Sequence, residues 1–183
     1  QRQLGLIFGN TAHAAAATLA IFFLGLGLGS WAFGERAARS RRPLRDYGLL
    51  EIALAGAALL FFAGLPLQRA AYATAFQASD GTGAALAAMR VALAAVVLLP
   101  PAFCMGGTLP LMGQHLVRAL PAAGRTGATL YTVNTLGGAL GDLAAGFWLP
   151  AAWGTTRAYL VAVGLSAGVG AIAVAAAPAE TRR

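Results

Sequence analysis

The hydropathy pattern of the chain consists of long apolar stretches separated by short polar segments. The apolar stretches cover approximately residues 10–34, 47–65, 84–118, 127–150 and 156–177. A transmembrane α-helix needs about 20 mainly apolar residues, and each stretch approaches or exceeds that length. The pattern therefore predicts an all-α, polytopic transmembrane helix bundle of about five spans, with residues 1–183 forming a single domain.

The third stretch carries Pro100-Pro101, then Gly106-Gly107 and Pro110. A straight helix over 84–118 would be about 50 Å long, whereas the hydrocarbon core of a bilayer is about 30 Å thick. Proline removes a backbone hydrogen bond and crowds the preceding turn. The sequence therefore predicts that this helix is kinked or broken at Pro100-Pro101.

Composition supports the membrane class and excludes several kinds of site. The chain is 58% hydrophobic and 10% charged, with a mean hydropathy of +0.70, whereas soluble domains carry about 25% charged residues. Cys104 is the single cysteine, which excludes a disulfide framework and a thiolate metal site. No zinc, calcium or nucleotide-binding motif is present, so we expect no catalytic residue, no cofactor and no metal in this chain.

The net charge of +7 comes from arginines that lie between the apolar stretches, which favours membrane topology over nucleic-acid binding. The predicted loop 35–46 is the richest, with Arg36, Arg39, Arg41, Arg42 and Arg45. Short basic loops stay on the cytoplasmic side. The pattern predicts a multi-pass protein of a bacterial inner membrane, with its C-terminus in the cytoplasm. The same arginines could instead bind lipid phosphate or dock a partner.

Glu51, Arg90 and Asp142 are ionisable residues in or near the apolar stretches. Such side chains are expensive in lipid and must face protein or water. Arg90 and Asp142 fall at similar predicted depths, about 9 and 12 Å below the outer surface at 1.5 Å per residue. We expect them to pair between the third and fourth spans, or else to form a substrate or proton site. Glu51 is expected to cap or pair with the basic loop, with a transport role as the alternative.

One face of the fourth span is polar or small. Tyr131, Asn134, Gly138 and Asp142 follow one another at helical spacing. This stripe predicts either a seam between helices or the lining of a polar cavity.

Two GxxxG pairs predict close helix packing, because a missing side chain lets a neighbouring backbone approach. The pairs are Gly25 with Gly29 in the first span and Gly137 with Gly141 in the fourth.

Several segments together resemble a known family. GLGLGSWAFGERAARSRRPL, LLEIALAG, PPAFCMGGTLPLM and GRTGATLYTVNTLGGALGDLAAGFWLPAAWG follow one another as in the membrane domain of spermidine synthase-like proteins, bacterial membrane relatives of polyamine aminopropyltransferases. The resemblance covers nearly the whole chain. It implies half of a major-facilitator bundle, six helices, of which the first is missing here. Residues 29–44 also resemble the major-facilitator loop motif, with Ala38 where that motif carries aspartate.

The resemblance implies an anchor for a cytosolic aminopropyltransferase domain that these residues do not contain. Two alternatives remain open: a half-size major-facilitator-like transporter of a small solute such as a polyamine, or a structural assembly module. A transporter predicts a polar cavity lined by Asn134, Asp142 or Glu51, and a partner in the form of a second copy or a second membrane half. The expected partners are thus the lipid bilayer and one of these proteins, with no nucleic acid.

Overall fold

A computed structural model describes the backbone of residues 2–78, 84–119 and 123–177, without the side chains of residues 2–14, 65, 68–69, 71–72, 75–76, 78, 84–87, 90 and 123. The elements are α1 (Arg2–Arg39), α2 (Pro43–Ala78), α3 (Ala84–Ala119), α4 (Ala123–Leu143), a π-helical segment η1 (Ala144–Trp148), α5 (Leu149–Trp153) and α6 (Thr155–Ala176). The protein is therefore an all-α helical bundle, as predicted. The turn at Asp80-Gly81 and the last six residues lie outside the described residues.

Among the residues that the structure describes, four helices are long and apolar enough to cross a membrane. They are Ala15–Arg39, Pro43–Gly64, Val91–Ala119 and Thr155–Ala176. This is the architecture of a multi-pass membrane protein. Helix α4 contains most of the predicted span 127–150 but is not among the four, because Asn134, Asp142 and a high share of glycine and threonine lower its hydropathy. A fifth span there stays a prediction.

Helices α1 and α2 are longer than the apolar stretches that predicted them. Helix α1 runs through Asn10 without interruption, so it begins before the predicted stretch 10–34. Helix α2 continues through Pro66 to Ala78. The predicted loop 35–46 is reduced to residues 40–42. Arginine and alanine are good helix formers, and they extend a helix beyond the part that is apolar.

Helix α3 is one unbroken helix through Pro100, Pro101 and Pro110. The predicted break at Pro100-Pro101 is therefore wrong. Each proline removes one backbone hydrogen bond. The segment that contains them is held by packing, since Ala102, directly after the proline pair, is 1% exposed.

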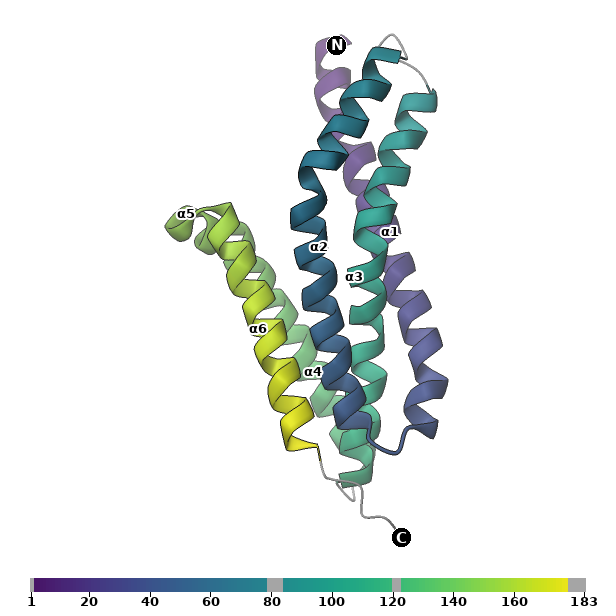
Figure 1. Cartoon of the computed structure of the whole chain (residues 1–183), viewed down its shortest axis with the longest axis vertical. Coiled ribbons are helices and arrows are strands. Elements are labelled where there is room, and N and C mark those ends of the chain that lie inside the picture. The colour runs from purple at the N-terminus through teal and green to yellow at the C-terminus, as the bar shows by residue number, and fades with distance from the viewer. Residues whose placement is uncertain (1, 79–83, 120–122, 178–183) are drawn as a thin grey trace.

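Helix α3 occupies the centre of the described bundle (Figure 1). It packs against α1 on one side and α2 on the other, and α2 also packs against α6. The small core gathers around Leu111, which is fully buried with Ala37 and Leu50. Many large apolar side chains point outward instead, such as Trp31 at 76% and Leu60 at 75% exposure. An apolar exterior of this kind suits contact with lipid.

Helices α1 and α3 approach each other through glycines on both sides. Gly25 lies against Ala102, and Gly29 lies against the backbone oxygen of Phe103. From the other side, Gly106 lies against the backbone oxygen of Leu26. A side chain at Gly29 or Gly106 would collide with backbone, so the close contact requires glycine at both positions.

The turn between α1 and α2 is held by side chains. The Ser40 hydroxyl donates to the Asp46 carboxylate at 2.7 Å and accepts the backbone N–H of Arg42 at 3.1 Å. Arg118, in the last turn of α3, donates to the carbonyl oxygens of Ser40 at 2.6 Å and Ala38 at 3.0 Å. A cation there satisfies carbonyl groups that the end of α1 leaves without a helical partner. Three helices are thereby joined at one end of the bundle.

We expect Arg118→Gln to destabilise the protein by about 1 kcal/mol, because charge-assisted hydrogen bonds to backbone are lost at an exposed position. Thermal unfolding in detergent measures the effect. Arg125→Gln is the matched control, since Arg125 is exposed and no interaction of its side chain with a described residue is recorded. An equal loss in both variants would contradict the role of Arg118.

Candidate functional site

The described chain places one carboxylate inside its apolar region, between two helices. The Ser166 hydroxyl on α6 donates to Oε2 of Glu51 on α2 at 2.9 Å. Both side chains are half-buried. The two helices come close because Gly48 and Gly170 face each other: a Cβ on Gly170 would lie 2.7 Å from the Gly48 carbonyl oxygen. Glycine packing therefore brings the acid and its hydroxyl partner within reach.

Two further side chains surround the carboxylate. Tyr47, one turn earlier on α2, lies within hydrogen-bonding reach of Glu51. Cys104 on α3 lies near enough to feel the charge of Glu51. The carboxylate thus lies between α2 and α6, within electrostatic range of α3. Such an acid can accept hydrogen bonds on the inner side of the bundle.

Glu51 was predicted to cap or pair with the basic loop, whereas its recorded hydrogen-bond partner on a neighbouring helix is Ser166. The reason is distance along α2. Glu51 follows the start of α2 at Pro43 by two turns, which is about 12 Å of rise, and packing with α6 supplies a closer partner.

We expect Ser166→Ala to destabilise the bundle by about 0.6 kcal/mol, the usual size of a hydrogen bond between membrane helices. Glu51→Gln should retain much of the bond, because an amide oxygen also accepts. A double-mutant cycle with Glu51→Leu and Ser166→Ala measures the coupling between the two side chains. Additive losses would mean that the two groups do not act together.

Three more of the predicted polar candidates lie on α4, and no other helix of the described chain covers their side chains. Tyr131, Asn134 and Asp142 are all exposed. Gly137 and Gly141 have open space around them within the described chain. The structure therefore does not bring these residues together with Glu51, and it shows no packing at the second GxxxG pair.

The described residues include no ion pair between Arg90 and Asp142, which the sequence predicted. Helix α4 meets α3 where Gly113 faces Leu130, and Figure 1 shows α4 leaning away from α3 toward its other end. No hydrogen bond or ion pair joins Asp142 to another residue of the described chain. The side chain of Arg90 lies outside the described residues, so the pair stays a prediction.

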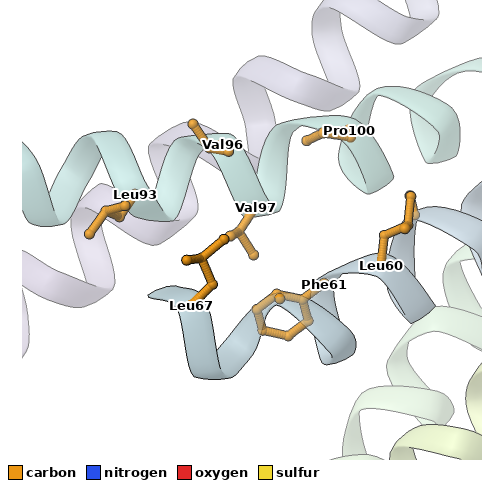
Figure 2. A pocket seen from close by; sticks show the side chains of 9 residues that line it. Leu60, Phe61, Leu67, Leu93, Val96, Val97 and Pro100 are labelled. Carbon is orange, nitrogen blue, oxygen red and sulfur yellow. The ribbon is translucent and has the colours of Figure 1, made fainter. Parts of the chain in front are cut away.

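An apolar cavity of about 530 Å³ lies between α2 and α3 (Figure 2). The described residues that line it, from α2 and α3, are all apolar: Ala57, Leu60, Phe61, Gly64, Leu67, Leu93, Val96, Val97 and Pro100. Glu51, Asn134 and Asp142 are not among them. The described part of its lining therefore lacks the polar groups that a transporter of a cation would need.

Sequence reasoning did not single out Tyr47, Gly48, Ser166 or Gly170. A signal was present, because Ser166 and Gly170 form a small-xxx-small pair on α6. Many such pairs occur in this chain, however, and only the pairing of α2 with α6 shows which one matters. Within the part of the chain that the structure describes, no group of three or more His, Cys, Asp or Glu side chains could hold a metal ion.

No protein-family model, curated protein or solved structure matches this chain. The function is therefore inferred from the arrangement of the chain's own residues.

Proposed function

We propose that this chain is a membrane anchor, the membrane domain of a spermidine synthase-like protein that holds a cytosolic aminopropyltransferase domain at the bacterial inner membrane. The observation that carries the proposal is the gathering of basic residues at one end of the bundle. The turn between α1 and α2 and the adjoining helix ends carry Arg36, Arg39, Arg41, Arg42, Arg45 and Arg118. Basic residues of this kind face the cytoplasm.

The end of α6 lies at the same basic end. Gly48, near the start of α2, packs against Gly170 and Val174, near the end of α6. Farther along, the Tyr159 hydroxyl donates to the carbonyl of Ala58 at 2.7 Å. The two helices are thus antiparallel, as Figure 1 shows. A domain connected after α6 would sit on the cytoplasmic side, where an enzyme of polyamine synthesis would find its substrates.

The contacts inside the bundle favour an anchor over a transporter. Glu51 accepts a hydrogen bond from Ser166, and glycines form the close contacts of α1 with α3 and of α2 with α6. The described residues that line the cavity between α2 and α3 are apolar. A carrier of a polyamine would need an acid that faces a water-filled path. A half-size transporter remains the second candidate, favoured by one observation: Asp142 is exposed on α4.

The coding region that follows Arg183 tests the anchor most simply. We expect it to continue into a domain with a glycine-rich nucleotide-binding loop and an acidic diamine site. A stop codon directly after Arg183, with no aminopropyltransferase gene beside it, would contradict the proposal.

Proteoliposomes test the second candidate. Vesicles that hold the purified chain are loaded with buffer and given labelled putrescine or spermidine outside, under an imposed membrane potential. An anchor predicts uptake equal to that of empty vesicles. Uptake that exceeds this background and is lost in Asp142→Asn would support the transporter and contradict the anchor.

A further inference from the structure

The basic turn between α1 and α2 borders a small groove. A cavity of about 190 Å³ lies between Phe33 and Arg36 on α1 and Asp46, Leu49 and Leu50 on α2. Its lining is apolar except for Arg36 and Asp46. The Arg36 guanidinium lies 6.0 Å from the centre of the Phe33 ring, which favours a position of the cation beside the groove.

The turn that carries these residues is fixed rather than loose. The hydrogen bond from Ser40 to Asp46 lies within the turn, and two hydrogen bonds from Arg118 connect the turn to α3. Cations presented on a fixed turn lose little freedom when they bind an anion.

The charge around the groove is strongly positive. Five arginines lie in residues 35–46 against two carboxylates, Glu35 and Asp46. Glu35 is already paired with Arg39 at 3.4 Å, and Asp46 accepts the Ser40 hydroxyl. The groove thus complements a ligand that is negatively charged.

The groove lies where two candidate membrane spans end, and the ends of membrane helices lie among lipid headgroups. The candidate spans Ala15–Arg39 and Pro43–Gly64 end and begin at this turn. Clusters of arginine next to membrane helices attract anionic lipids. The apolar lining formed by Phe33 and Leu49 offers contact to the first carbons of an acyl chain, which a free phosphate ion lacks.

We propose that this groove binds the phosphate of an anionic phospholipid. Arg36 contacts the phosphate, since a guanidinium can donate two parallel hydrogen bonds to it. Phe33 and Leu49 contact the glycerol end of the lipid. Arg45, in the first turn of α2, adds to the field that selects an anionic headgroup over a zwitterionic one.

Native mass spectrometry of the full chain in detergent tests the proposal with phosphatidylglycerol and phosphatidylcholine as probes. We expect preferential retention of phosphatidylglycerol. Arg36→Gln should weaken this retention about fivefold, and the double variant Arg36→Gln/Arg45→Gln about 25-fold. Arg36→Lys keeps the charge and should lose less than Arg36→Gln. Arg157→Gln is the control, because Arg157 is exposed at the opposite end of the bundle.

Equal retention of the two lipids, or an equal loss in Arg36→Gln and Arg157→Gln, would overturn the proposal. So would displacement of the lipid by millimolar inorganic phosphate, which would mean that the site recognises the free anion. Thermal unfolding of each variant shows that it is folded before its lipids are counted. The result is independent of the anchor function, which is tested by the coding region and by transport.

Discussion

Gly29→Val is expected to destabilise the bundle by about 3 kcal/mol, at the upper end of the usual range for overpacking. The new Cβ would fall on the backbone oxygen of Phe103. A backbone atom cannot rotate away as a flexible side chain can, so α1 and α3 would have to separate. Because α1 packs on α3 along much of its described length, their separation would disturb the largest helix contact in the described chain. Unfolding of the purified protein in a titration with sodium dodecyl sulfate measures the loss.

Gly27→Val is the matched control. Gly27 lies two residues away on the same helix, and nothing is found within 4 Å of a Cβ placed there. The same substitution should then change stability by no more than about 0.5 kcal/mol. A Gly27→Val variant as unstable as Gly29→Val would show that helix propensity, rather than the contact with α3, causes the loss.

Gly170→Val is expected to have a comparable effect, about 2–3 kcal/mol, on the contact between α2 and α6. A Cβ at Gly170 would lie 2.7 Å from the Gly48 carbonyl oxygen, 2.9 Å from a methylene of Ile52 and 3.0 Å from the Cβ of Glu51. Pushing α6 away would also break the hydrogen bond from Ser166 to Glu51. The same detergent titration measures the loss of stability.

A second substitution on α6 separates packing from propensity. Gly168 has open space around it, so Gly168→Val should be nearly neutral. In the Gly170→Val background, Ser166→Ala should add no further loss, because the helices are already apart. A full additional loss from Ser166→Ala would contradict the link between the glycine contact and the carboxylate.

Hydropathy was enough to predict an all-α bundle and to locate the four helices that could cross a membrane. The exact ends of α1 and α2 were harder to predict, because arginine-rich and alanine-rich segments continue a helix past its apolar part. The prediction of a break in α3 overestimated the effect of its prolines. The prolines remove backbone hydrogen bonds, but Ala102 and Gly106 pack tightly against α1 and hold the segment together.

The site was less predictable than the fold. Glu51 could be singled out, because a charge in an apolar stretch is rare. Its partner could not, since Ser166 lies far away in the sequence and reaches Glu51 only through the packing of α6 on α2. The role of Arg118 likewise depends on the fold, because its side chain reaches the Ser40 carbonyl only through the packing of α3 on α1.

Cysteine accessibility in intact bacterial cells that express the chain tests the central claim, that the basic end of the proposed membrane anchor faces the cytoplasm. In a Cys104→Ser background, single cysteines are introduced as Arg41→Cys at the basic turn and Ala151→Cys at the opposite end, where both positions are exposed. A membrane-impermeant maleimide is applied before and after permeabilisation of the inner membrane. We expect labelling of Ala151→Cys in intact cells and of Arg41→Cys only after permeabilisation. Labelling of Arg41→Cys in intact cells, with Ala151→Cys protected, would contradict it.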